Sequence, residues 1–199
     1  MRTPAIVLLA LVLAASAVAP AAAQAPRRAR AQPGRDSGFW YSISAGPGWA
    51  RLTCSICAGS RRTGISAALG LGGSTSRMMR IGGEFAAWRE SHDGVTQTLL
   101  SVGAAAYWYP SPRQRLYLRG GAAFLMHRAN DGTDVVTSSG IGPQLGIGSE
   151  YRVGRSWLLA PFIHYAVGVF GGDVKFNGGQ AAGSATVSFL QVGASLTRR

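Results

Sequence analysis

The 199-residue chain combines 47% hydrophobic residues and 28 glycines with only 14% charged residues. A soluble domain usually carries about 25–35% charged residues on its surface, so this composition argues against one. The net charge of +12 comes from 20 basic and 8 acidic residues. These basic residues form no stripe with interleaved aromatic residues, which argues against nucleic-acid binding.

The N-terminal residues have the pattern of a secretory signal peptide. Met1-Arg2 precedes an apolar run over 5–18, and Ala21-x-Ala23 offers a cleavage site that leaves Gln24 as the first mature residue. The run is shorter than the roughly 20 residues that a spanning helix needs. We therefore predict a cleaved signal peptide over 1–23 and an exported protein, with an uncleaved membrane anchor as the alternative.

The next segment, 24–37, contains prolines and four arginines without apolar periodicity. This pattern predicts a disordered basic leader. The remaining residues, 38–199, have the size of one domain and contain no second change of composition. No apolar run in this part approaches about 18 residues, which excludes a helical membrane protein.

Period-two alternation runs through the rest of the chain. Ile141, Leu145 and Ile147, for example, alternate with Gln144 and several glycines, and only a strand puts two such sets on opposite faces. Strands of about 9–11 residues suit a tilted membrane strand, whereas globular strands more often have about 5–6. Eight such segments are predicted, near 39–49, 64–72, 79–87, 96–109, 116–128, 140–153, 157–170 and 185–197.

The connections between these segments alternate in length. Short connections are expected at 76–77, 110–115 and 154–156, and longer ones at 51–62, 90–95, 130–137 and 171–183. Short turns on one rim and long loops on the other are typical of outer-membrane barrels. An even number of strands then puts both ends of the barrel on the short-turn side, which we assign to the periplasm.

The two faces of the predicted strands differ in composition. The less apolar set consists mostly of Gly, Ser and Ala, which suits a narrow lumen better than a water-exposed surface. A soluble lipocalin-like barrel would reverse the two faces. From Phe39 to Trp49 a strand tilted by about 40° spans roughly 25 Å, the height of a lipid-facing band. The predicted fold is all-β, an eight-stranded antiparallel up-and-down transmembrane β-barrel.

With its signal peptide, eight alternating strands, alternating connections and aromatic rims, the chain resembles the small outer-membrane barrels of the OmpA and OmpX type over 38–199. The resemblance implies location in the bacterial outer membrane, insertion by the barrel-assembly machinery, and contact with outer-membrane lipid and lipopolysaccharide. Members commonly end on an aromatic residue, whereas this chain ends Thr197-Arg198-Arg199. The architecture hosts adhesins, resistance factors, anchors and a few lipid-modifying enzymes, so it does not fix the function.

Several charged and polar residues share the phase that points into the predicted lumen. Because buried charges must be paired, we expect them to form a lumenal ion-pair network, with a gated narrow pore as the alternative. The predicted network consists of Arg80, Glu84, Arg119, Gln144, Glu150, Arg152 and His164.

The expected loop over 51–62 carries two further features. Arg51, Arg61 and Arg62 are candidates for contact with lipopolysaccharide phosphates, the alternative being solvated interfacial charge. Cys54 and Cys57 predict a loop disulfide in an exported chain. A metal site would need two further ligands, and a thioredoxin-like site would need a βαβ setting, so no metal or cofactor site is expected.

Catalytic residues are not evident in the sequence. Lipid A deacylases are barrels of this size with a lipid-facing His and a Ser two positions later, whereas His164 is on the inward phase and is followed by Ala166. We therefore predict a monomeric, non-catalytic barrel with a structural or surface-interaction role. The alternative is a narrow channel or a barrel that binds a small molecule in its lumen.

Overall fold

The computed structural model describes residues 38–55, 57, 59–111 and 115–199. The predicted signal peptide and leader lie outside these residues. The regular structure of the described part consists of strands. Among these residues, no helix has the length and apolar character needed to cross a membrane.

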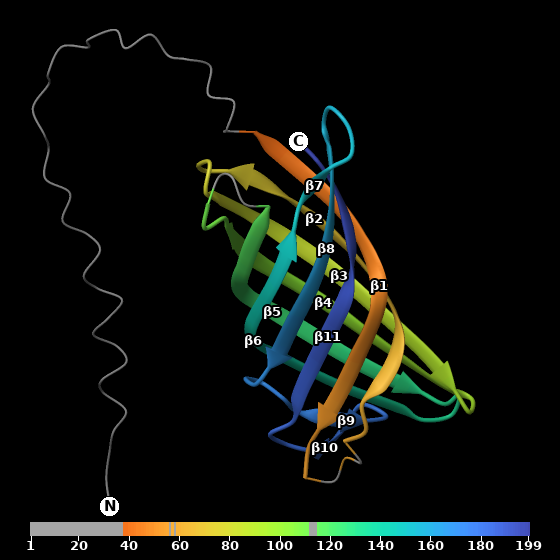
Figure 1. Ribbon diagram of the computed structural model, residues 1–199. Coiled ribbons are helices and arrows are strands. Elements are labelled where there is room, and N and C mark those ends of the chain that lie inside the picture. Colours follow the sequence, from red (N-terminus) through yellow and green to blue (C-terminus); the bar gives the residue numbers. More distant parts are fainter. Residues whose placement is uncertain (1–37, 56, 58, 112–114) are drawn as a thin grey trace, which may run out of the picture. The chain divides into compact units, whose positions relative to one another are not determined.

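Eight long strands of the described chain close into one antiparallel barrel (Figure 1). Each pairs with its neighbours along the chain, and β1 (Phe39–Thr53) closes the ring by pairing with the last strand. The predicted fold is confirmed. The other seven barrel strands are β2 (Arg62–Ser74), β3 (Met79–His92), β4 (Val95–Trp108), β5 (Leu116–Asn130), β6 (Val135–Ser149), β8 (Trp157–Gly168) and β11 (Thr186–Arg198).

Three short strands extend the ring. β7 (Tyr151–Arg152) follows β6 and pairs with β8. At the opposite end of the barrel, β9 (Val174–Phe176) and β10 (Gly179–Ala182) form a hairpin that pairs with β6. We call the end that holds Phe39 and Arg198 the terminal rim, and the end with the β9–β10 hairpin the loop rim (Figure 1).

Two connections at the loop rim are shorter than the sequence analysis expected. Pairing of β3 with β4 continues to His92 and Val95, so only Asp93-Gly94 remains as the turn. Both turn residues have positive φ, 50° and 79°, the conformation of the type I′ turn for which Asp-Gly is preferred. The prediction of a long connection over 90–95 is therefore wrong, because Asp93-Gly94 closes the hairpin in two residues and the strands continue up to it.

The β5–β6 connection is also short, since pairing continues to Asn130 and Val135. The carboxylate of Asp131 accepts hydrogen bonds from the backbone N–H groups of Asp134 at 2.7 Å and Thr133 at 2.9 Å. These donors stabilise the charged form and lower the pKa of Asp131 below its ordinary value. The turn is therefore held by its own backbone and side chains.

Large apolar side chains point away from the barrel on its outer surface. Ile65, Leu145 and Ile141 are 79%, 62% and 52% exposed, while Gln144, between the last two, is buried. One row of directly paired residues crosses five strands through Leu69, Phe85, Val102, Phe124 and Ile141. Soluble monomers rarely expose an apolar surface this continuous. The apolar face is therefore the outer one, as the composition of the two faces predicted.

Much of the interior nearest the loop rim is filled with apolar side chains, which we call the apolar plug, and the polar side chains of His127 and Gln97 lie beside it. The indole of Trp88 donates a hydrogen bond to the carbonyl oxygen of Gly48 at 2.9 Å, and a Cβ at Gly48 would lie 2.7 Å from the Trp88 ring. The sequence analysis expected mostly Gly, Ser and Ala on the inward face and did not predict that large apolar side chains such as Trp88 would fill this half. The plug consists of Ala50, Ala86, Trp88, Leu99, Ala123, Leu125, Ala166, Val187 and Phe189.

Replacing Leu125, which is fully buried in the plug, should leave a cavity. We expect Leu125→Ala to lower the free energy of unfolding by about 2–5 kcal/mol. Leu145→Ala on the outer surface is the matched control and should cost less than half as much, because the surrounding medium fills the space. Urea unfolding of the protein in phospholipid vesicles, followed by tryptophan fluorescence, measures both. Equal losses would contradict a close-packed plug.

Candidate functional site

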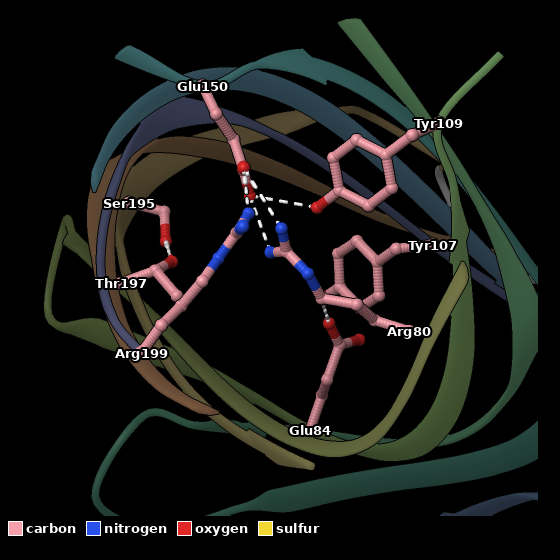
Figure 2. Close-up of polar contacts among 8 residues, drawn as sticks. All are labelled: Arg80, Glu84, Tyr107, Tyr109, Glu150, Ser195, Thr197 and Arg199. Carbon is pink, nitrogen blue, oxygen red and sulfur yellow. Dashed lines mark hydrogen bonds and ion pairs between the residues drawn. The ribbon is translucent and has the colours of Figure 1, made fainter. Parts of the chain in front are cut away.

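The interior near the terminal rim contains a buried cluster of charges centred on Glu150, which lies between β6 and β7. Arg80 of β3 donates two hydrogen bonds to its carboxylate, at 2.7 and 3.2 Å. The hydroxyl of Tyr109 donates a third at 2.8 Å, and Arg199 pairs with the same carboxylate. Figure 2 shows these side chains converging from different strands inside the barrel.

A second ion pair joins Arg119 of β5 to Glu84 of β3, and the hydroxyl of Tyr107 also donates to Glu84. The side chains of Arg119 and Glu84 are only 13% and 10% exposed, so each charge needs the other. Each ion pair includes one residue from the inward face of β3, Arg80 in the first and Glu84 in the second. The network therefore ties β3 across the lumen to β5 and to the end of β6.

The amide of Gln144 on β6 connects the second ion pair to the backbone of β4 and β5 and to His164 of β8. Its oxygen accepts a hydrogen bond from Arg119 at 2.9 Å, and its nitrogen donates to the carbonyl oxygens of Ala104 and Ala122 at 3.0 and 3.2 Å. His164 Nε2 lies 3.1 Å from the same amide oxygen. Because that oxygen can only accept, the Nε2 of His164 carries the proton.

The structure brings together six of the seven residues predicted to form a lumenal network: Arg80, Glu84, Arg119, Gln144, Glu150 and His164. Arg152 is the exception, because it lies exposed in β7. The alternation that suggested Arg152 continues past Ser149, where β6 ends. Glu150, one residue past the end of β6, is still buried in the lumen, whereas Arg152, two residues further on, lies exposed at the terminal rim.

The sequence analysis missed four members of the network, namely Tyr107, Tyr109, Tyr117 and Arg199. Tyr107 on β4 and Tyr117 on β5 have the inward phase, so the alternation of residue types could have predicted them. The rings of Tyr107 and Tyr117 lie 5.5 Å apart, and the guanidinium of Arg80 lies 4.5 Å over the ring of Tyr109. These aromatic rings bury the ion pairs and exclude water from them.

A cavity lies between this network and the wall formed by β1 and β11. It leaves about 50 Å³ for the centres of water molecules, which is room for only a few of them. The apolar plug fills the interior beyond it, an arrangement that argues against an open channel. Residues of β1 and β11 that line the cavity are Trp40, Ser42, Ser44, Gln191, Ser195 and Thr197.

The outer surface at the loop rim carries a row of basic and hydroxyl side chains that we call the basic row. It runs across neighbouring strands through successive directly paired residues, which in a sheet point to the same face. Its three cationic members are exposed, and the next row towards the apolar surface contains Leu100 and Met126. The basic row consists of Arg89, Thr98, Arg128, Thr137 and Lys175.

The three arginines expected to contact lipopolysaccharide are in different environments. Arg51 is exposed on the outer face of β1, and Arg61 is exposed in the loop before β2. Arg62 is half-buried on the inward phase of β2, so it points towards the mouth of the lumen and not towards lipid. The sequence analysis placed Arg62 in the loop, whereas β2 begins at Arg62, two residues earlier than predicted, and this fixes its inward phase.

The β1–β2 connection also contains both cysteines. The sulfur atoms of Cys54 and Cys57 are at bonding distance and their Cα atoms lie 5.0 Å apart, in keeping with the predicted loop disulfide. Among the residues that the structure describes, no group of three His, Cys, Asp or Glu side chains converges as a metal site would require.

The three histidines have unrelated surroundings. His164 bonds to Gln144, His127 Nε2 lies 3.2 Å from Gln97 Oε1, and His92 pairs with Asp93 at 3.0 Å on the surface. Within the described part of the chain, none of these contacts joins a histidine to both a serine and a carboxylate, the arrangement that an activated serine needs.

The closed eight-stranded ring, the apolar outer face and the internal ion pairs define the fold of the small outer-membrane β-barrel proteins, as the resemblance predicted. The solved structure of Neisserial surface protein A is similar, with 17% identity and a TM-score of 0.56 over 80% of this chain and 96% of that one. Ail, the attachment invasion locus protein of Yersinia pestis, is similar with 14% identity and a TM-score of 0.50, covering 79% and 97%. No family model and no curated protein sequence matches the chain.

Removing the carboxylate of Glu150 should destabilise the barrel, because Arg80, only 7% exposed, would then be buried without a partner. We expect Glu150→Ala to lower the free energy of unfolding by about 3–5 kcal/mol. Glu150→Gln should cost less, since its amide oxygen still accepts from Arg80. Urea unfolding in vesicles measures the difference, and the double variant Arg80→Met with Glu150→Met should recover much of the loss. Full stability of Glu150→Ala would contradict the pairing.

Proposed function

We propose that the protein is a non-catalytic barrel of the bacterial outer membrane that contacts lipopolysaccharide and other surface ligands at its loop rim. The exposed apolar face is the main support, because hydrocarbon is the solvent in which such a surface is stable. In this proposal the chain is exported, the signal peptide is cleaved, and the barrel-assembly machinery inserts the protein as a monomer. The terminal rim faces the periplasm and the loop rim faces outwards.

The basic row supports the lipopolysaccharide contact. Arg89 and Arg128 flank Thr98 on β4, so they stand two strands apart, about 10 Å at the backbone. Long flexible arginine side chains at this spacing can converge on one phosphate group, and a guanidinium binds phosphate through two parallel hydrogen bonds. The row lies directly beyond the apolar surface, at the level where lipid headgroups begin. Arg51 and Arg61 extend the exposed positive charge at the same rim.

The names of the structural neighbours are compatible with a role at the cell surface. One is a surface protein and the other an attachment invasion locus protein. For this chain, a role at the cell surface rests on the residues of its own loop rim, where the β9–β10 hairpin pairs with β6.

A barrel that binds a small molecule in its lumen is the second candidate. The cavity beside the ion pairs favours it over a narrow channel, since the apolar plug blocks the other half of the interior.

Location in the outer membrane predicts heat-modifiability. The mature protein should fractionate with outer membranes and migrate differently on a detergent gel before and after boiling, because a closed barrel resists unfolding by detergent. Leu145→Arg, which puts a charge on the outer surface, should reduce the folded fraction in vesicles, at a cost of about 2–4 kcal/mol if it lies near the bilayer centre. Recovery of a well-folded monomer in buffer without detergent would refute the location.

Charge reversal in the basic row should weaken lipopolysaccharide binding. We expect the double variant Arg89→Glu with Arg128→Glu to bind lipopolysaccharide at least about tenfold more weakly, since two charge-assisted contacts are lost. The matched control is Arg152→Glu with Arg155→Glu, which reverses two exposed charges at the terminal rim. Surface plasmon resonance with vesicle-embedded protein gives both affinities. If the two double variants bind equally well, the basic row is only solvated interfacial charge.

A further inference from the structure

Three outward-facing side chains meet at the terminal rim, at the seam where the barrel closes. Tyr41 of β1 pairs directly with Arg198 of β11, and Arg198 pairs with Trp157 of β8. Directly paired residues of a sheet point to the same face, so these side chains lie next to one another on the outer surface. We call Tyr41, Arg198 and Trp157 the rim cluster.

The two aromatic rings of the rim cluster position the guanidinium of Arg198. Arg198 donates a hydrogen bond to the hydroxyl of Tyr41 at 3.4 Å, and its guanidinium carbon lies 5.8 Å from the centroid of the Trp157 ring. The rings of Tyr41 and Trp157 meet edge to face at 6.1 Å. A guanidinium has five N–H donors, and Tyr41 accepts from only one of them. Arg198 is exposed and pairs with no carboxylate in the described part of the chain, so its other donors are accessible to a ligand.

The next outward row towards the middle of the barrel is apolar. Ile43, Leu196 and Leu159 are paired in the same way across β1, β11 and β8, and we call them the apolar strip. Ile43 and Leu159 are 57% and 40% exposed. A cation and amphipathic rings beside an apolar strip match the chemistry of a phospholipid, with its acyl chains along the strip and its phosphate at the rim cluster.

A second arginine of the terminal rim stacks on an aromatic ring in a similar manner. The guanidinium of Arg115 lies 5.1 Å from the centroid of the Tyr151 ring. Tyr151 pairs with Leu159, so it borders the apolar strip on the side away from β1. Positive charge held on aromatic rings therefore lies both at the end of the strip and beside it.

Among the described residues, no acidic side chain lies on the outer surface of the terminal rim. Of the eight acidic residues in the sequence, Asp36 lies outside the described part, and Glu84 and Glu150 are inside the lumen. The remaining five lie at the loop rim, namely Glu90, Asp93, Asp131, Asp134 and Asp173. Exposed arginines at the terminal rim include Arg115, Arg152, Arg155 and Arg198. This one-sided charge favours an anionic headgroup over a zwitterionic one.

We propose that the rim cluster binds the headgroup of an anionic glycerophospholipid, with the phosphate on Arg198 and the acyl chains along the apolar strip. This inference rests on the proposed membrane location, in which the terminal rim faces the periplasm and its phospholipid leaflet. The site is separate from the basic row, which lies at the opposite rim. A lipid bound there contacts β1, β11 and β8 at the seam that closes the barrel.

Titration with phosphatidylglycerol in nanodiscs tests the site. The refolded protein is placed in phosphatidylcholine nanodiscs, the mole fraction of phosphatidylglycerol is raised, and the indole N–H signals are followed in ¹⁵N–¹H NMR spectra. We expect the Trp157 signal to shift and to saturate while phosphatidylglycerol is still the minor lipid. Trp108 is the internal control, because it is 49% exposed at the same rim and no arginine stacks on its ring in the described part of the chain. Its signal should change only in proportion to the lipid composition.

Two variants separate a positioned arginine from general surface charge. Arg198→Gln should weaken phosphatidylglycerol binding about fivefold, whereas Arg155→Gln, which removes an exposed charge from the same rim outside the rim cluster, should change it less than about twofold. Arg198→Lys should lie between Arg198→Gln and the wild type, since it keeps the charge but loses the planar fork. Heat-modifiability shows that each variant is folded; if Arg198→Gln does not fold, the comparison of Trp157 with Trp108 in the wild type decides.

Soluble glycerol 3-phosphate, which has the phosphate without acyl chains, should leave the Trp157 signal in place. A Trp157 response that matches Trp108, equal losses in Arg198→Gln and Arg155→Gln, or an equal response to glycerol 3-phosphate would each overturn the lipid site. A protein that does not enter phosphatidylcholine nanodiscs would overturn the membrane location and the site together. Entry without a saturable Trp157 shift would overturn the site alone.

Discussion

Closure of the strand ring is the constraint on which the rest of the structure depends. Pairing of β1 with β11 and of β6 with β8 leaves no free edge in the barrel wall, so backbone hydrogen bonds are satisfied within the wall. Closure also forces each side chain to face either outwards or inwards. Every charge on an inward position must then find its partner within a narrow lumen, and every apolar side chain on an outward position needs an apolar solvent.

The interior satisfies this constraint in two different ways. Near the loop rim, Trp88, Leu125 and Phe189 fill the lumen by close packing. Near the terminal rim, arginines and glutamates pair under a cover of tyrosine rings. The cavity lies beside the charged network, against the wall formed by β1 and β11, where neither packing nor pairing fills the space beside Trp40. A barrel with this interior suits a wall, an anchor or an enclosed binding site better than a conduit.

The alternation of residue types along the strands was sufficient to predict the barrel and most of the lumenal network. A period of two is local, so Arg80, Glu84, Arg119 and Gln144 could be assigned to the inward face without knowing their neighbours. The prediction failed where a strand began or ended, as at Arg62 and Arg152, because phase has meaning only while the strand continues. The sequence analysis also missed the turn at Asp93-Gly94, although the preference of Asp-Gly for two-residue hairpin turns is local and predictable from the sequence.

Strand register, by contrast, was decided only by the tertiary structure. Register determines that Arg89 and Arg128 flank Thr98, and that Trp40, Arg119 and Gln191, far apart in the chain, face one cavity. The sequence by itself determined the eight strands and which residues face inwards, because those follow from spacing along one strand. Which inward residues meet depends on how far each strand is shifted along the next, and this shift is fixed by turns, glycine contacts and packing across the whole ring.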